Sequence, residues 1–403
     1  MEIDKTFDYI IIGGGSIGTS TVHALIRQLP DARIAWFTGD HKRTASNDFI
    51  KIIRDVYPDD AFPTFAKRAL DQWTNETPYC DYFRKTGWIQ AIRDDAKNMT
   101  KTLSDDILTG ADMVRIVGSV TEPRLEQGEA LFLNPTVGYA DSALAVQAVS
   151  DMVTELGVKR HEKNVTKVVV ENGSCVGVEV EGSIIKADKH IVVSTGAWTP
   201  ALLEGSGITV PPNFFLPTAI GVATLVLSDE ELQSLSSMPI LATQDGEIML
   251  SHREKVLKIH STKTFAISHP DQLSDAVDIT PNRQLLEKML PQFKGRHLDS
   301  FICPDLLTPY QNQIIDSVAG VQKLIIATGG SYHSYKFLPN IGGLVVARIR
   351  GQPGRDPIEA KLLERCRWDR SEGTMSVHPK TVPHSSSAMN PNGVMMRHEY
   401  RSL

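Results

Sequence analysis

Near the start of the chain, the stretch Tyr9-Ile-Ile-Ile-Gly-Gly-Gly-Ser-Ile-Gly18 reads as an apolar strand that runs into a glycine-rich turn. Gly13, Gly15 and Gly18 fit the pattern G-x-G-x-x-G, and a helical run to about Arg27 follows. In this strand–turn–helix context, the first glycine permits the tight turn, the second lets a pyrophosphate approach the backbone, and the third lets helix and strand pack closely. The free N–H groups at the helix start suit phosphate charge. The pattern therefore predicts a binding site for a dinucleotide.

The second predicted strand, Arg33-Ile-Ala-Trp-Phe37, bears on which dinucleotide is bound. An acidic residue at the end of this strand usually binds a ribose hydroxyl. The chain has Thr38 there instead, followed by Gly39 and Asp40. Thr38 can hydrogen-bond a ribose more weakly than a carboxylate does, or Asp40 can swing back toward it. This departure argues against a freely exchanging nicotinamide coenzyme, and it is tolerable if the cofactor is anchored in another way.

The composition is that of a globular protein of two domains. The chain has 403 residues, of which 41% are apolar and 22% charged, and its net charge of −6 excludes a basic nucleic-acid-binding protein. Its four cysteines show no C-x-x-C spacing, so we expect free thiols in a reducing compartment.

The ends of the chain and one uncharged stretch bear on its location. Met1–Lys5 leads straight into the first strand, which leaves no room for a signal peptide. Residues 205–228 carry no charge, but their prolines and glycines favour a loop followed by the strand Ile220–Leu227 over a membrane helix. The final Arg-Ser-Leu has the wrong order for the peroxisomal Ser-Lys-Leu signal. We therefore expect a soluble, cytoplasmic protein.

Hydrophobic periodicity predicts alternating helices and strands along the rest of the chain. Helices are expected at about 59–73, 141–156 and 281–289 and from about 342, and strands at 165–170, 176–180, 189–194, 220–227 and 323–328. Residues 372–403 are rich in Ser, Pro, Met and Asn without periodicity, which predicts a mobile tail.

Five segments spread over the chain carry unusual motifs. They are Asn47-Asp48-x-x-Lys51-Ile-Ile-Arg54-x-x-Tyr57, Gly138-Tyr139-x-Asp141, Ser194-Thr-Gly-Ala-Trp-Thr199, Cys303 ahead of Thr308, and Ala327-Thr-Gly-Gly-Ser-Tyr-His-Ser-Tyr-Lys336-Phe-Leu-Pro-Asn-Ile-Gly342. On these motifs the chain resembles the D-amino-acid-oxidase-type flavoproteins, specifically the monomeric sarcosine oxidase branch. That branch includes pipecolate and saccharopine oxidases and the fructosyl amino acid oxidases. The resemblance extends to about Gly351 and implies FAD rather than NAD.

The resemblance implies an α/β fold in which a Rossmann-like FAD-binding domain is interleaved with a substrate domain. Segments 1–75, 140–205 and 300–370 would form the FAD-binding domain. Segments 76–139 and 206–299 would form an α+β substrate domain built on a mainly antiparallel sheet. We expect a monomer.

Cys303 stands where this family links a cysteine sulfur to the flavin 8α-methyl group, so the resemblance implies covalent 8α-S-cysteinyl FAD. A thiolate near an electron-poor flavin ring is suited to this attack. Covalent attachment would explain why the missing ribose acid is tolerated. As plain sequence, a buried free cysteine is the alternative, and this remains the interpretation of Cys80, Cys175 and Cys366.

Three basic residues resemble the family's substrate-carboxylate site. Arg54 and Lys336 match the cationic pair that grips the carboxylate, where arginine offers two parallel N–H donors and lysine a point charge. Lys51 resembles a second basic residue beside that site. Without the resemblance, Lys51 and Arg54 at i, i+3 would be read as a solvated face.

Lys258, in the predicted strand Lys255-Val-Leu-Lys-Ile-His260, resembles the lysine that activates oxygen. A fixed cation stabilises the negative charge that develops when oxygen accepts electrons. Strand alternation places Lys258 and His260 on one face and Leu257 and Ile259 on the other. Lys255 and Lys263 are rival candidates, and an outward-facing lysine on an edge strand is the alternative.

The family resemblance also implies a set of FAD contacts. Val165 matches a position whose backbone contacts the adenine part, and the turns after the strands at 189–194 and 323–328 would approach the cofactor closely because they are rich in glycine. The expected contacts are Gly13, Gly15, Ser16, Ile17, Gly18, Thr38, Ser46, Asn47, Lys51, Val165, Gly196, Trp198, Cys303, Gly329, Gly330, Ser331, Tyr332, His333 and Lys336.

The predicted function is therefore the oxidation of a secondary or N-substituted amino acid, with catalysis by Lys258, Lys336 and Arg54. A hydride equivalent would pass from the amine to covalent FAD and then to O2, which gives an imine and hydrogen peroxide. Three alternatives remain open. They are a fructosyl amino acid oxidase, a flavin dehydrogenase with an acceptor other than oxygen, and a non-catalytic flavin-binding protein. The motifs leave the substrate side chain open.

Overall fold

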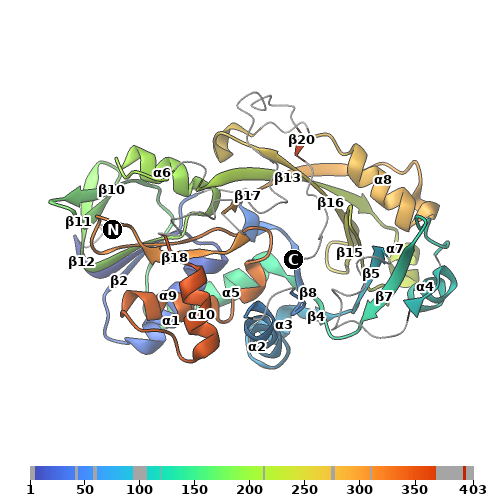
Figure 1. Cartoon of the computed structure of the whole chain (residues 1–403), viewed down its shortest axis with the longest axis horizontal. Helices are drawn as coiled ribbons and strands as arrows, with labels where there is room; N and C mark the ends of the chain where they lie inside the picture. Colours follow the sequence, from blue (N-terminus) through green and yellow to red (C-terminus); the bar gives the residue numbers. More distant parts are fainter. Residues whose placement is uncertain are drawn as a thin grey trace.

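A computed structural model of the chain describes residues 5–40, 44–57, 61–93, 107–118, 120–211, 214–273, 277–308, 311–368 and 394–395. The described residues form two large sheets that lie at opposite ends of an elongated molecule, with a small sheet between them (Figure 1). The tail predicted at 372–403 lies outside the described residues, apart from the two-residue strand β20 (Val394–Met395).

The first large sheet is the dinucleotide-binding sheet predicted from the glycine motif. Its parallel core runs in the order β19, β12, β1, β2, β9, and β10, β11 and β18 extend it in antiparallel fashion. The strands are β1 (Thr6–Ile12), β2 (Ile34–Phe37), β9 (Arg160–His161), β10 (Val165–Glu171), β11 (Ser174–Val180), β12 (Ser183–Val193), β18 (Ile314–Ser317) and β19 (Leu324–Thr328).

Both faces of this sheet are covered, which explains why β1 is apolar without alternation. Ile11 belongs to the core that packs under the helices α1 (Ser16–Gln28), α5 (Ser142–Glu155) and α9 (Ile341–Ile349). Ile10 faces the opposite core, which contains side chains of β11 and of helix α6 (Thr199–Gly205). Burial on both faces favours continuous apolar strands in parallel sheets.

The second large sheet has the strand order β17, β13, β16, β15, β14, β5, β7, β6 and is antiparallel except for the β14–β5 pair. One of its faces packs against helices α4 (Gly110–Val117) and α8 (Thr280–Met289). The short helix α7 (Asp229–Ser234) follows β13. The strands are β5 (Trp88–Arg93), β6 (Ile107–Leu108), β7 (Glu129–Asn134), β13 (Leu216–Val226), β14 (Ile240–Thr243), β15 (Gly246–Ser251), β16 (Val256–Ala266) and β17 (Asp299–Leu307).

A small sheet, β3 (Ile50–Ile53), β8 (Gly138–Asp141) and β4 (Phe83–Lys85), connects the two larger ones. The helices α2 (Phe62–Asn75) and α3 (Tyr79–Tyr82) lie next to it, and α10 (Pro357–Arg365) packs on α2 and α9. This small sheet matters for the site because β3 carries Lys51.

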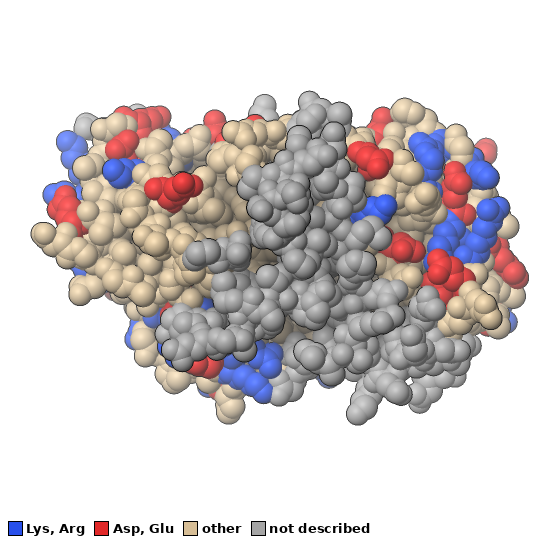
Figure 2. Space-filling view, turned by 45° about the horizontal axis from the view of Figure 1, so that its top comes forward, with Lys and Arg blue, Asp and Glu red and all other residues tan. Residues whose placement is uncertain are grey.

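The predicted α/β fold with a mainly antiparallel second sheet is confirmed. The division into domains stays a prediction, and β17, from a segment assigned to the FAD-binding domain, pairs with β13 of the second sheet. Lys258 does not lie on an edge strand, because β16 runs between β13 and β15. Within the described ranges, no helix is long and apolar enough to cross a membrane. On the face shown in Figure 2, basic and acidic side chains are interspersed.

Candidate active site

The turn after β1 lies against the ends of the two neighbouring strands, β12 and β2. Gly13 has φ +121°, and a Cβ there would lie 2.3 Å from the carbonyl oxygen of Ser194 at the end of β12. The Gly13 N–H donates to the carbonyl of Phe37 at the end of β2 (2.7 Å), and its own carbonyl accepts from Trp36 Nε1 (2.9 Å). Only glycine combines this conformation with this approach.

A cavity of about 510 Å³ opens at the carboxyl ends of the parallel strands, where ligands of open α/β sheets bind. Ser16, at the start of α1, donates its N–H to Ser46 Oγ (2.9 Å) on the cavity wall. The expected FAD contacts that line it are Gly13, Gly15, Ser16, Ile17, Thr38, Ser46, Asn47, Val165, Gly196, Trp198, Gly329 and Gly330.

Thr38 faces this cavity, whereas Asp40 does not line it. The Asp40 carboxylate accepts a hydrogen bond from Asn164 Nδ2 at 2.6 Å. Of the two candidates for the ribose contact, the structure therefore places Thr38 at the cavity. Arg160 and Lys163 also line this cavity and have no counterpart in the sequence-based prediction.

A second cavity of about 140 Å³ adjoins the first and shares Ser16, Ala45, Ser46, Asp305 and Gly330 with it. It gathers side chains from the small sheet, the second large sheet and the segment after β19. Its lining includes Asp48, Lys51, Arg54, Glu247, Lys258, His260, Cys303, Tyr332, His333 and Lys336. The cavity therefore brings together the three residues predicted to hold substrate, the first candidate for oxygen activation and the cysteine predicted to bond the flavin.

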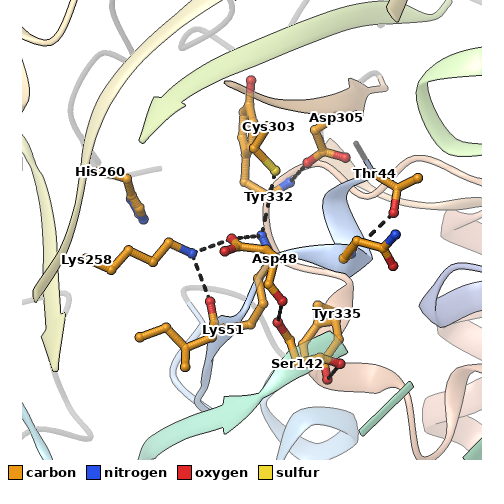
Figure 3. A network of polar contacts seen from close by, with 12 residues as sticks. Thr44, Asp48, Lys51, Ser142, Lys258, His260, Cys303, Asp305, Tyr332 and Tyr335 are labelled. Carbon is orange, nitrogen blue, oxygen red and sulfur yellow. Dashed lines mark hydrogen bonds and ion pairs between the residues drawn. The ribbon is translucent and has the colours of Figure 1, made fainter. Parts of the chain in front are cut away.

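Lys258 projects from β16 to Asp48 (Figure 3). Its ammonium group forms an ion pair with Asp48 Oδ2 and donates to the carbonyl of Ile50 (2.9 Å). Lys51 Nζ donates to the same Asp48 oxygen at 2.8 Å. One carboxylate oxygen thus holds two ammonium groups, and the cluster carries a net positive charge.

Burial and charge shift the protonation of this cluster. Burial opposes ionisation of Asp48, but Lys258 and Lys51 outweigh it and hold the pKa of the carboxyl at about 2. Burial lowers the pKa of Lys258, and Asp48 counteracts that effect. Burial also opposes the charge on Lys51, but the negative charge of Asp48 raises its pKa above the usual value. The structure thus favours the ionised form of Asp48.

Cys303 lies on β17 with its thiol pointing into this cavity, 4.0 Å from Lys51 Nζ. Burial raises the pKa of the thiol, and the Lys51 ammonium opposes that shift. The other cysteines, Cys80, Cys175 and Cys366, line neither described cavity. The chain therefore offers one thiol where a flavin could be bonded.

Arg54 and Lys336 both lie close to the Tyr57 ring. The Arg54 guanidinium is 4.8 Å from the ring centroid and the Lys336 ammonium 5.4 Å. Lys336 is buried and donates to the carbonyl of His333 at 2.6 Å, while His333 Nδ1 and the Tyr57 hydroxyl are 3.0 Å apart. Two cations are thus held by aromatic and backbone groups at one wall of the cavity.

His260 faces Glu247 across the β15–β16 pair, with Nε2 and Oε2 2.7 Å apart. Burial lowers the pKa of His260 to about 4. Although Glu247 favours its charged form, this imidazole is neutral at physiological pH. It adds a polar group to the cavity without adding charge.

Some predicted residues lie outside the two cavities. Gly18 packs against the carbonyl of Gly13, and Ser331 is buried beside Thr308 and Leu306. Lys255 is exposed and paired with Asp229 at 2.7 Å, and Lys263 lines neither described cavity. Among the three lysines considered for oxygen activation, the structure brings Lys258 to the site.

Sequence reasoning assigned no role to Asp48, Asp305 or Glu247. Asp48 lies three residues before Lys51 in the motif that begins at Asn47, and in the sequence only this spacing points to a role for Asp48. Asp305 accepts the N–H of Tyr332 at 2.7 Å and approaches Gly330 so closely that a Cβ there would lie 2.3 Å from Oδ1. Glu247 gave no signal, because it reads as an outward residue of an ordinary strand.

The two cavities fit FAD. The first offers a glycine turn and a helix N-terminus of the kind that binds a pyrophosphate. The second offers a thiol and a net positive charge at the adjoining end. The residues that would hold the cofactor are the turn around Gly13, the wall formed by Thr38 and Val165, and Cys303.

The chain belongs to a known family of flavoenzymes. Residues 8–348 match the family of FAD dependent oxidoreductases (DAO), so the protein is an FAD-dependent oxidoreductase. The match spans both large sheets and both cavities. The predicted family and FAD as its cofactor are thereby confirmed, whereas covalent attachment through Cys303 stays a prediction.

Several oxidases are similar to the chain over most of its length. The chain is 25% identical to L-saccharopine oxidase of Schizosaccharomyces pombe, over 85% of this chain and 89% of that protein. It is 24% identical to monomeric sarcosine oxidase of Arthrobacter sp., over 85% and 92%. Among solved structures, fructosyl peptide oxidase from E. terrenum matches with a TM-score of 0.78 at 20% identity, over 93% and 94% of the chains. An Amadoriase I mutant from Aspergillus fumigatus matches with 0.77 at 23% identity, over 91% and 90%.

Proposed function

We propose that this protein oxidises the C–N bond of a secondary or N-substituted amino acid, with covalently bound FAD and O2 as the acceptor. The observation that carries the proposal is the meeting of Arg54, Lys336, Lys258 and Cys303 around one cavity next to the nucleotide cavity. The names of the saccharopine and sarcosine oxidases support an N-substituted amino acid as the substrate class.

FAD, when bound, supplies the redox chemistry, because it takes two electrons from the amine and delivers them to O2, which yields imine and hydrogen peroxide. The protein positions the reactants. Arg54 and Lys336 would bind the substrate carboxylate, since both are cations on one wall of the cavity.

Lys258 would act when oxygen accepts electrons. Its ammonium is held by Asp48 and Ile50, so it needs no reorganisation to face developing negative charge. The neutral His260 on the same strand would add no charge of its own to that of the ammonium.

Cys303 would hold the flavin ring. The sulfur would bond the 8α carbon with loss of the thiol proton and one methyl hydrogen, and the two electrons released would pass to oxygen. Lys51, 4.0 Å from the sulfur, favours the thiolate that attacks. Such a bond would also compensate for the neutral Thr38 at the ribose end.

Acid precipitation tests the covalent bond, with Cys303→Ser and Cys175→Ser as a matched pair of buried cysteines. Wild type and C175S should keep yellow colour in the pellet and show a peptide containing Cys303 with the added mass of FAD. C303S should release all flavin to the supernatant. A colourless pellet from wild type that was matured with flavin would exclude the bond.

Anaerobic mixing with a substrate panel tests the reaction. N-methyl and cyclic amino acids and saccharopine should bleach the flavin, and air should restore it with stoichiometric hydrogen peroxide. If fructosyl amino acids bleach the flavin fastest, they are the substrate class instead of N-methyl and cyclic amino acids. Reduced flavin that persists in air would indicate a dehydrogenase, and a panel that bleaches nothing would indicate a different function.

A further inference from the structure

The carboxylate of Asp48 is placed unusually for a buried acid. Its side chain is 2% exposed, and its Oδ2 takes both ammonium groups of the cluster. Its other oxygen, Oδ1, is buried without a hydrogen-bond partner among the described residues. A buried carboxylate normally has all its lone pairs satisfied, so this arrangement asks for an explanation.

The backbone fixes this carboxylate at the cavity. The carbonyl of Asp48 accepts hydrogen bonds from Ser142 Oγ and from the Ala143 N–H (3.2 Å), at the start of α5. The N–H of Ser142 donates to the carbonyl of Phe49 at 2.9 Å, and its own carbonyl accepts the Tyr335 hydroxyl at 2.9 Å (Figure 3). Asp48 is therefore anchored to the dinucleotide-binding part, whereas Lys258 comes from the second large sheet.

The polar contacts of Lys258 come from one short segment. Asp48 and the carbonyl of Ile50 bind its ammonium group, which also lies 5.3 Å from the centroid of the Phe49 ring. The side chain is 3% exposed. A buried ammonium without a counter-ion loses its proton readily. The position and the charge of Lys258 therefore both depend on residues 48–50.

We propose that Asp48 is a positioning residue for oxygen activation, which holds the Lys258 ammonium at the cavity and keeps it charged. This proposal rests on the proposed function, because it assigns Lys258 to the oxygen step. With one carboxylate against two ammonium groups, the cluster keeps one net positive charge. That charge lies where oxygen would become negative.

The burial of the two lysines predicts which of them loses its proton when the Asp48 carboxylate is removed. Without Asp48, two cations would share a buried site, and one of them would lose its proton. Lys258 would do so first, because its side chain is 3% exposed and that of Lys51 is 24% exposed. Asp48→Asn should therefore make oxygen activation depend on pH in a way that the wild type does not show.

Other titratable groups face the cluster and could also contribute to the pH dependence of D48N. They are His260 on β16, Glu247 on β15, and Cys303 and Asp305 on β17. Arg54, Tyr332, His333, Tyr335 and Lys336 also line the cavity and are retained in every variant of this experiment. His260 is neutral above its pKa of about 4, so it does not titrate between pH 6 and 10. Cys303 is a thioether in the flavinylated enzyme of the proposed function. Glu247 and Asp305 are retained in every variant, so they are common to all the profiles.

The first experiment measures reoxidation of dithionite-reduced holoenzyme by oxygenated buffer in a stopped-flow instrument, from pH 6 to 10. The wild type should be fast across this range, and Lys258→Met slow across it. D48N should lie within about 3-fold of the wild type at pH 6 and fall at least 10-fold, toward K258M, as the pH rises. In the D48N/K258M double variant, the loss of Asp48 should slow reoxidation no further than K258M alone, because Asp48 acts through Lys258.

Two further variants separate charge from packing. Asp48→Glu retains the carboxylate and should retain the flat profile. Asp316→Asn removes another buried carboxylate, paired with Arg348 at 3.2 Å away from both cavities, and should also leave the profile flat. If D48N does not fold, Asp48→Ser, which leaves room for water, should show the same fall with pH.

A second readout does not depend on activity. The loss of melting temperature in D48N holoenzyme relative to the wild type should shrink as the pH rises from 7 to 10. In D48N the folded-state pKa of Lys258 lies below its unfolded value, so the cost of burying its charge is full at low pH and disappears as the proton is lost. A loss caused by packing alone would not change with pH.

The outcomes distinguish the proposals. A flat D48N profile alongside slow K258M would overturn the role of Asp48 and leave Lys258 in place. A D48N/K258M variant slower than K258M by the factor that D48N alone shows would also overturn it. If K258M reoxidises like the wild type, the oxygen step of the proposed function fails first, and the role of Asp48 fails with it.

Discussion

The two cavities are built by different means. The larger one is formed mainly by backbone turns, after β1, β12 and β19, at the carboxyl ends of parallel strands. The smaller one is formed by charged side chains from β3, β16, β17 and the short helix Tyr335–Phe337. A site made of backbone depends on glycine and strand order, whereas a site made of side chains depends on ion pairs. Substitutions should therefore affect different properties of the protein in the two cavities.

The largest effect on a rate is expected for Lys258, whose positive charge is proposed to act in one step, the reduction of oxygen. Lys258→Met should slow reoxidation of reduced enzyme by about 10²- to 10³-fold, because a fixed cation counts most where charge develops. Anaerobic reduction by substrate should change much less. Lys263→Met, on the same strand but outside both described cavities, is the control and should leave both half-reactions unchanged. Equal slowing of both half-reactions in K258M would show that the lysine is structural.

The backbone-built cavity should respond through cofactor binding rather than through one kinetic step. Gly13→Ala places a Cβ 2.3 Å from the Ser194 carbonyl at φ +121° and should prevent FAD incorporation at a cost of about 3 kcal/mol or more. Gly157→Ala is the matched control, because Gly157 has φ +91° but no described heavy atom would lie within 4 Å of the added Cβ. It should cost about 1 kcal/mol and retain full flavin. Normal flavin content in G13A would contradict the close approach.

Substitution of the basic residues proposed to bind the substrate carboxylate should weaken substrate binding. Arg54→Ala should raise KM about 100-fold, since the loss of a charge-assisted pair costs a few kcal/mol. Lys51→Ala should raise KM far less, because Lys51 already pairs with Asp48 at 2.8 Å. Initial rates over a range of substrate concentrations separate the two cases. Equally mild effects would place the anionic group of the substrate elsewhere.

The same contrast explains how far the sequence could be interpreted. The first cavity was predictable because G-x-G-x-x-G carries its own local geometry, and Thr38 showed directly that the ribose acid is missing. Lys51, Arg54, Cys303 and Lys336 were recognised through family motifs, not through their spacing. That Lys258 and Lys51 share one carboxylate could not be predicted, because residues 48 and 258 meet only through the packing of two sheets. Ser331 was predicted to contact FAD from the motif alone, yet the turn at positive φ points it inward.

The smallest effect is expected in acid and concerns Asp48 again. Its pKa is about 2 in the fold and 3.8 in a free chain, so the folded state binds fewer protons than the unfolded one between these values. The stability from this group is present above pH 4 and is lost as the pH falls through 2, by roughly 2 kcal/mol. Urea unfolding of wild type and D48N between pH 5 and 2 measures this contribution. As the pH falls, the difference between their free energies of unfolding should narrow by that amount. The buried lysines stay protonated throughout this range, so they add no slope of their own. A constant difference would mean that folding does not shift the pKa of Asp48, and therefore that Lys258 and Lys51 do not stabilise its charge in the folded protein.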